Sequence, residues 1–209
     1  MIRYLSLMFV IFALWARPAA AQIQSRGPEI FPGPNEISGH IGASGGYSDT
    51  TPGGLKLQFD YGRMGRPFRF GSVWFNIGFS NVFGPRGNCV VAGGFYNCGY
   101  GNRGITIEPY AGVKWKFQTG IPLVPYIKLD GTFIGIVNRF CRDNGFAFGV
   151  RSGGGVKYFL TRHIGLGIEV TWVIGPAFYS GPDGCYPNSP GRTELYVGVD
   201  YLVGIEYVF

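Results

Sequence analysis

The stretch that decides the fold closes the chain: "ELYVGVDYLVGIEYVF", residues Glu194 to Phe209. Every second residue is apolar, and the residues between them include three acids and two glycines. A period of two places alternate side chains on opposite faces of a strand. Because β-branched residues and glycine are weak helix formers, we predict a β-strand with one wholly apolar face. That face comprises Leu195, Val197, Val199, Tyr201, Val203, Ile205, Tyr207 and Phe209.

The same period recurs in seven further stretches, each with an apolar row and a row that carries polar or charged residues. The chain is therefore predicted to be all-β with eight strands. The seven stretches are Glu36–Ser48, Gly54–Tyr61, Ser72–Ser80, Gly104–Phe117, Leu123–Phe133, Phe146–Tyr158 and His163–Ile174.

The composition indicates an outer surface that does not face water. Charged residues make up only 14% of the chain and aromatic residues 17%, with 36 glycines, whereas charged residues are about 25% of a typical soluble domain. No segment after the N-terminal region offers the roughly 20 continuous apolar residues of a membrane helix. A chain of this kind can cross a membrane only as a closed barrel.

The N-terminus predicts export. Arg3 precedes the apolar stretch Tyr4–Ala16, and Ala19 to Ala21 supply small residues for cleavage, which together are typical of a secretory signal peptide. We expect residues 1–21 to be the signal peptide, 22–36 an irregular periplasmic lead-in and 37–209 the barrel.

The positive net charge does not indicate nucleic-acid binding. Without Arg3 and Arg17 the chain has 16 basic and 12 acidic residues, a net charge of +4. No basic helix or run of Lys and Arg is present to follow a phosphate backbone.

The predicted connections alternate in length, as in up-and-down barrels with short periplasmic turns and long outer loops. This pattern places both termini in the periplasm. The short turns are Gly62–Arg69, Gln118–Pro122 and Leu160–Arg162; the other connections are Asp49–Gly53, Asn81–Arg103, Asn138–Gly145 and Pro176–Arg192.

From Glu36 to Phe209 the chain resembles the small eight-stranded outer-membrane barrels of Gram-negative bacteria, the OmpA/OmpX-like, porin-family-like type. The ending "GIEYVF", with Ile205, Tyr207 and Phe209 at alternate places, resembles the signal that the barrel-assembly machinery reads in this group. The resemblance implies an eight-stranded antiparallel up-and-down transmembrane β-barrel in the cell outer membrane, in contact with its lipid and lipopolysaccharide. A water-soluble β-sandwich or lipocalin-like barrel is the alternative.

The charged residues of the polar rows are expected to face the lumen, since Lys or Arg on the lipid face at mid-bilayer costs about 2–4 kcal/mol. Six are basic and seven acidic, and this balance favours paired charges that plug the barrel, with Lys128 and Arg151 pairing with acids across it. The alternative is a narrow passive porin-like channel for small solutes. The predicted network comprises Lys56, Asp60, Glu108, Lys114, Lys116, Lys128, Asp130, Arg151, Lys157, Glu169, Glu194, Asp200 and Glu206.

All four cysteines fall in the predicted long loops, where an even count in an exported protein implies disulfides. Of the three possible connectivities we prefer Cys89–Cys98 and Cys141–Cys185. Metal binding is the alternative, but the spacing is unusual for zinc and neither histidine is near in sequence.

The predicted outer loops also carry an excess of arginine, which can bind phosphate with two hydrogen bonds. These residues are equally compatible with contact to lipopolysaccharide and with ordinary solvated loop charge. An extracellular ligand of the loops is a third interpretation. The arginines are Arg86, Arg103, Arg139, Arg142 and Arg192.

No catalytic, cofactor-binding or metal site is predicted. Some small outer-membrane barrels modify lipid A, and their deacylase family has His and Ser two residues apart. Neither His40 nor His163 has this spacing, and both are interpreted as hydrogen-bonded residues near the periplasmic rim. The glycines of "GYGNRG", Gly99–Gly104, are interpreted as turn residues because the dinucleotide motif needs a strand before it and a helix after it. We therefore expect a structural or surface-interaction role. The first alternative is the narrow channel, and the second is a lipid A-modifying enzyme.

The disulfide prediction can be tested by mass spectrometry of the protein after thiol alkylation. We expect no alkylation of the unreduced protein and four alkylated cysteines after reduction. Alkylation of all four without reductant would contradict the prediction.

Overall fold

The computed structural model describes residues 33–46, 53–84, 104–137, 144–180 and 191–209, and the backbone alone of 90–92, 95–97 and Arg192. The expected signal peptide, all four cysteines and most of the lead-in lie outside the described residues. Among the described residues, no helix is long and apolar enough to cross a membrane.

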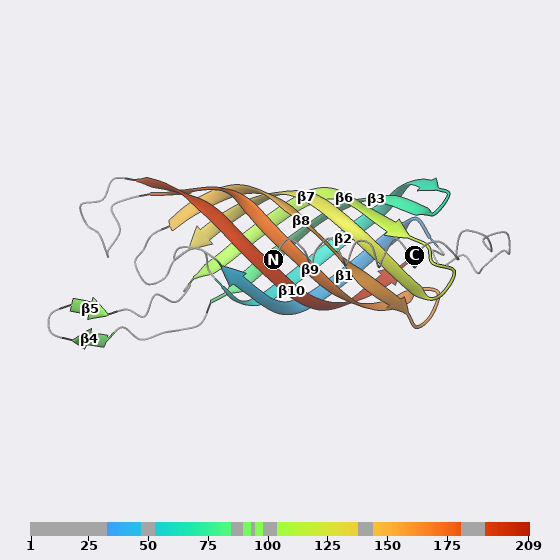
Figure 1. The fold of residues 1–209 in the computed structure, drawn as a ribbon, viewed down its shortest axis with the longest axis horizontal. Coiled ribbons are helices and arrows are strands. Elements are labelled where there is room, and N and C mark those ends of the chain that lie inside the picture. Colours follow the sequence, from blue (N-terminus) through green and yellow to red (C-terminus); the bar gives the residue numbers. More distant parts are fainter. Residues whose placement is uncertain are drawn as a thin grey trace, which may run out of the picture.

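Eight long antiparallel strands close into a barrel (Figure 1), which confirms the predicted fold class. Around the barrel the strands follow the order β1-β10-β9-β8-β7-β6-β3-β2, so the sheet closes where the first strand pairs with the last. The strands are β1 (Asn35–Gly46), β2 (Gly54–Phe68), β3 (Gly71–Phe83), β6 (Ile105–Phe117), β7 (Leu123–Val137), β8 (Asn144–Phe159), β9 (Ile164–Tyr179) and β10 (Arg192–Val208).

Several boundaries differ from the sequence prediction; β3 and β9, for example, extend to Phe83 and Tyr179, inside predicted loops. The predicted loop 81–103 contains a small two-stranded sheet formed by β4 (Val90–Ala92) and β5 (Phe95–Asn97). The first strand begins at Asn35, two residues before the predicted start of the barrel at residue 37. The predicted turn 62–69 is mostly strand, because β2 continues to Phe68 through a β-bulge that interrupts its period of two.

The two ends of the barrel differ. At the end that carries Phe209, called here the C-terminal end, the connections between strands are short (Figure 1). The backbone closes there through Asn35, whose N–H donates to the Phe209 carbonyl at 3.0 Å and whose carbonyl accepts from the Phe209 N–H at 2.8 Å. The opposite end, called the loop end, carries the β4–β5 hairpin and the other long connections.

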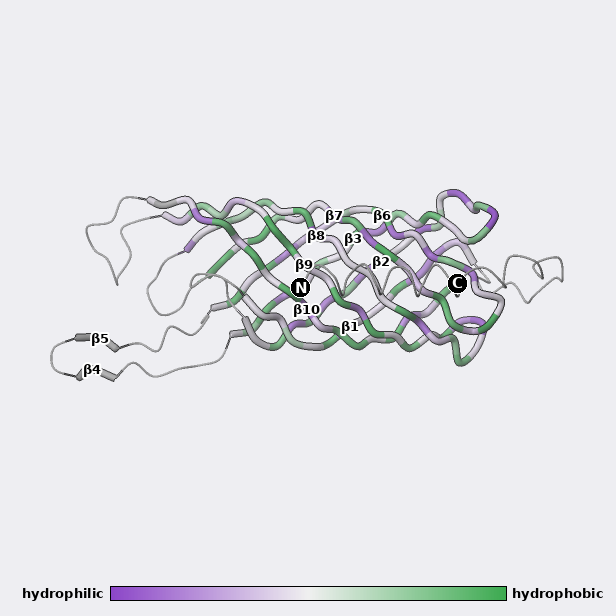
Figure 2. Tube along the Cα trace, in the orientation of Figure 1, coloured by the Kyte–Doolittle hydropathy of each residue, from purple (hydrophilic) through white to green (hydrophobic). Residues whose placement is uncertain are grey.

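The alternate rows face opposite sides of the wall, so hydrophobic and hydrophilic residues follow one another closely along the strands (Figure 2). The apolar rows point outward: Phe75, Ile168 and Leu195 are 60%, 61% and 56% exposed. A continuous apolar exterior of this kind is typical of a lipid-facing surface. In the water-soluble alternative these rows would have faced a core.

The strands β1 and β10 approach so closely at Gly42 of β1 that a larger residue does not fit there. A Cβ atom at Gly42 would lie 1.9 Å from the carbonyl oxygen of Tyr201, whereas at Gly45 of the same strand the nearest atom would be 3.9 Å away. The backbone of β10 would have to move to admit a methyl group at Gly42.

We expect Gly42→Ala to lower the free energy of unfolding by about 1–3 kcal/mol, as overpacking does. The matched variant Gly45→Ala should stay within about 0.5 kcal/mol of the original protein. Urea unfolding of the refolded barrel in lipid vesicles, followed by tryptophan fluorescence, measures both. Equal effects of the two variants would be inconsistent with this close approach.

Candidate functional site

The inward-facing side chains fill the barrel with buried charges, which lie in three contacting groups called tiers here. Burial of so many ionised groups is tolerated only when they are paired and hydrogen-bonded. The loop-end tier comprises Lys56, Glu108, Arg151 and Asp200; the middle tier His40, Asp60, Lys128, Asp130 and Glu169; the C-terminal tier Glu36, Lys114, Lys116, Lys157 and Glu206.

Glu108 is the centre of the loop-end tier. Its Oε2 atom accepts hydrogen bonds from Lys56 Nζ at 2.7 Å and from Ser80 Oγ at 2.8 Å, and Arg151 also donates to it. Lys56 donates a second hydrogen bond to Asp200 at 2.8 Å. Two cations and two carboxylates therefore neutralise one another inside the barrel.

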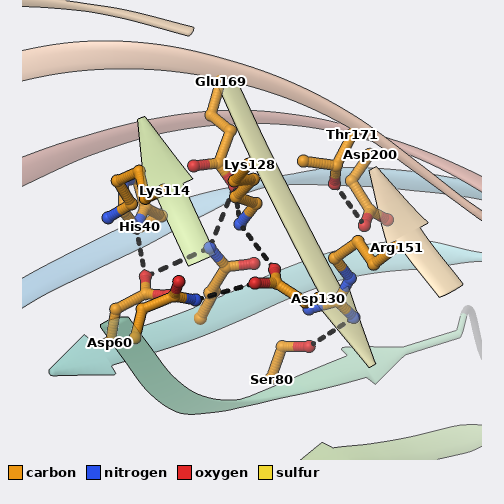
Figure 3. A network of polar contacts seen from close by, with 12 residues as sticks. His40, Asp60, Ser80, Lys114, Lys128, Asp130, Arg151, Glu169, Thr171 and Asp200 are labelled. Atoms are coloured by element: carbon orange, nitrogen blue, oxygen red, sulfur yellow. Dashed lines mark hydrogen bonds and ion pairs between the residues drawn. The ribbon is translucent and has the colours of Figure 1, made fainter. Parts of the chain in front are cut away.

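The middle tier is centred on Lys128 (Figure 3). The Lys128 Nζ atom lies 2.5 Å from a carboxylate oxygen of Glu169 and 3.7 Å from one of Asp130. His40 Nδ1 lies 3.3 Å from Asp60 Oδ2, and both side chains are almost fully buried. Three carboxylates and one lysine thus meet here, together with an imidazole.

The C-terminal tier has the opposite excess, with three lysines and two glutamates. Glu36 accepts a hydrogen bond from Lys114 at 2.9 Å and another from Lys116. Lys116 also donates to Glu206 at 2.8 Å, and Lys157 donates to the second oxygen of Glu206. The lysine excess of this tier partly offsets the acid excess of the middle tier.

Two buried tyrosines connect the tiers. The Tyr110 hydroxyl donates to Asp60 at 2.5 Å, and its ring lies 4.6 Å from the guanidinium carbon of the loop-end tier's arginine. The Tyr126 hydroxyl donates to Glu169 at 2.6 Å, and its ring lies 4.9 Å from Lys157 Nζ. Each ring therefore contacts a cation of one tier through its face and a carboxylate of the middle tier through its hydroxyl.

An apolar cluster covers the charged interior at each end. The loop-end cluster contains Ile134, Ile136, Ala147, Val173, Ala177, Tyr179 and Tyr196; the C-terminal cluster contains Trp74, Val124, Phe159 and Val208. These side chains are at most 5% exposed. Packed side chains thus separate the paired charges from solvent at both openings.

Twelve of the thirteen residues predicted for the lumenal network are buried in the barrel. Lys128 and Arg151 lie against acids from other strands, namely Glu169 and Glu108. The remaining residue, Glu194, is half-buried near the start of β10.

Two residues of the lumen, Glu36 and His40, lie elsewhere than predicted from the sequence. Glu36 fell outside the predicted barrel by one residue, although it continues the inward row of Ser38 and His40. His40 was predicted at the rim but is the sixth residue of β1 and lies inside the lumen. His163 does lie in a turn at the C-terminal end, where its Nδ1 contacts the Val208 carbonyl at 2.7 Å.

Some of the other predicted site residues lie on the outer wall, and the rest lie outside the described residues. Ile205, Tyr207 and Phe209 point outward and are 54%, 44% and 46% exposed. The cysteines and Arg86, Arg103, Arg139 and Arg142 lie outside the described residues, as does the side chain of Arg192. In the described part of the chain, no group of three or more His, Cys, Asp and Glu side chains is arranged to hold a metal ion.

No protein-family model matches the chain, and no curated protein matches it. Among solved structures, Neisserial surface protein A is similar at 11% identity and a TM-score of 0.53, over 84% of this chain and 96% of that one. The N-terminal barrel domain of Pseudomonas aeruginosa OprF matches at 13% identity and a TM-score of 0.43, over 84% and 98% of the two chains. The outer membrane enzyme PagL matches at 13% identity and a TM-score of 0.42, over 83% of this chain and 99% of that one.

The similarity to Neisserial surface protein A establishes only the fold. The other two structures have TM-scores below 0.5, and nothing is concluded from them. The chain is an eight-stranded closed antiparallel barrel, a fold that it shares with Neisserial surface protein A.

The central place of Glu108 generates a prediction for stability. Replacing it by leucine leaves Arg151 without its carboxylate, and an uncompensated buried charge costs about 3–5 kcal/mol. We expect Glu108→Leu to lower the free energy of unfolding by that amount in urea titrations.

The double variant Glu108→Leu/Arg151→Met is the control, because it also removes the orphaned cation while Lys56 keeps Asp200. It should be more stable than the single variant. A single variant within about 1 kcal/mol of the original protein would show that the tier does not hold the wall together.

Proposed function

We propose that this protein is a closed, non-conducting outer-membrane barrel that holds the segments at its loop end for structural or surface-interaction roles. One observation carries the proposal: three tiers of paired, buried charges fill the lumen, and an apolar cluster covers them at each end. A lumen filled in this way leaves no wide path for solutes within the part of the barrel that the structure describes.

The charge pattern also argues against the channel. A selective pore tends to be lined by charges of one sign in contact with water. Here six cations face seven carboxylates, and each of the cations is at most 2% exposed. An ion entering the lumen would have to break buried pairs that were formed at the cost of desolvation.

Among the described residues, Ser38, His40 and Asp60 resemble a hydrolase site in composition, but their arrangement does not support a catalytic role. Ser38 Oγ donates to Asp60 Oδ2 at 3.2 Å, and His40 contacts the same oxygen. A serine nucleophile needs its hydroxyl bonded to the imidazole base, with the acid on the far side of the ring. In this barrel both partners contact the acid, and all three side chains are buried away from any substrate.

The partners belong to the proposal as well. Outer-membrane lipid would surround the apolar exterior, and the barrel-assembly machinery would read the exposed Ile205, Tyr207 and Phe209. Lipopolysaccharide and an extracellular ligand remain the proposed contacts of the loop end.

Single-channel recording tests the proposal. The oxidised protein is refolded into a planar bilayer, and insertion is verified by heat-dependent migration of the same sample in gels. We expect no conductance steps from inserted barrels, because the lumen is filled. Steady, reproducible steps would refute the plugged barrel and make the lumenal charges a filter.

A matched variant shows that the assay detects an opened lumen. The triple substitution Trp74→Ala/Arg151→Ala/Tyr196→Ala removes one large buried side chain from each apolar cluster and one from the loop-end tier. We expect conductance steps or leaks from this variant under conditions in which the original protein is silent.

A further inference from the structure

A β-bulge on the β2–β3 hairpin changes which side chains face the membrane. Up to Arg63 the outward row of β2 follows odd numbers, and Arg63 lies opposite Phe75 of β3. The register then shifts between Met64 and Arg66, so that Arg66 lies opposite Val73, another outward residue. Without the extra residue Arg66 would face the lumen, since a slip of one residue reverses a strand's faces.

Gly65 lies at the register shift of the bulge, between Met64 and Arg66. A Cβ atom there would lie 2.6 Å from the ring of Phe75, so any larger residue would displace that ring. The bulge and its glycine thus bring Arg63 and Arg66 together on the outer wall, and both side chains are exposed. Hydrophilic residues gather at this hairpin in Figure 2.

The two arginines lie where the apolar wall ends. Tyr61 precedes Arg63 in the outward row, and Val73, opposite Arg66, has Trp115 as its other neighbour. Beyond them Phe68 packs edge-on against Phe117, with the ring centroids 6.3 Å apart. Aromatic residues of this kind mark the level of the lipid headgroups.

No described Asp or Glu side chain competes for these arginines. The acids described at the C-terminal end, Glu36 and Glu206, are buried in the lumen and pair with lysines. The other exposed Lys, Arg, Asp and Glu side chains described at this end are also arginines, namely Arg69 and Arg162.

We propose that Arg63 and Arg66 form a binding site for the phosphate of an anionic glycerophospholipid in the leaflet around the C-terminal end. Guanidinium groups bind phosphate oxygens in pairs and are less strongly hydrated than ammonium groups. At the interface an arginine on the lipid face costs only about 0–1 kcal/mol. Lipid is the occupant, rather than free phosphate, because the apolar wall below the arginines can hold the acyl chains of the same molecule.

Quenching of tryptophan fluorescence by brominated lipids tests the site, with half-buried Trp115 as the reporter. The protein carries Trp15→Phe and Trp172→Phe, which leaves Trp115 and the lumenal Trp74. It is reconstituted into phosphatidylcholine vesicles that contain brominated phosphatidylglycerol or brominated phosphatidylcholine. We expect phosphatidylglycerol to bind beside Trp115 with a preference of about fivefold per arginine.

The double variant Arg63→Gln/Arg66→Gln should lose this preference, whereas Arg162→Gln, at the same end but on another hairpin, should keep it. Folding of each variant is verified by heat-dependent gel migration, and both arginine side chains are exposed on the outer wall, outside the lumenal tiers. Equal quenching by the two lipids in the unsubstituted background would overturn the proposal. A preference that survives the double substitution, or that inorganic phosphate abolishes, would overturn it too.

Discussion

A backbone that crosses hydrocarbon must pair every N–H and C=O group within the protein, because no water is present to satisfy them. For this chain the constraint is met where β1 pairs with β10 over residues 36–46 and 198–208. Once that seam closes, each described strand of the wall has a neighbour on both sides. Closure also determines the interior, since alternate side chains must then point into a narrow lumen.

The filled lumen is the energetic consequence of closure. Lipid outside favours charged side chains on the inner face of the strands, where an ion without a partner would be strongly destabilising. The barrel resolves this with carboxylates shared between several cations, such as Glu108 and Glu36. Two tyrosines join neighbouring tiers, and apolar clusters separate the paired charges from water. The same features therefore stabilise the wall and fill the lumen.

The exterior of the barrel needs no paired charges. It must only be apolar at the depth of the acyl chains. At the C-terminal end the wall changes from Tyr61 and Phe75 to Arg63 and Arg66 within one bulged segment. The short hairpins thus differ in what they present to the membrane, although the barrel that supports them is regular.

The sequence by itself determined the strands and their faces. The period of two in segments such as Glu194–Phe209 depends only on the geometry of an extended chain, and it also predicted which charges turn inward. The ends of the strands were less predictable: β1 began before the predicted boundary at residue 37, which excluded Glu36, and the period fails at Gly65.

Only the tertiary structure decided which charges meet. Lys56 bonds to Asp200, 144 residues away, because closure brings β2 and β10 into one lumen. No local sequence pattern predicts this contact. The alternation along a strand shows which face a side chain is on, but not which side chain of another strand it meets across the barrel. The outward place of Arg66 has a more local origin, in the register shift of the β2–β3 hairpin.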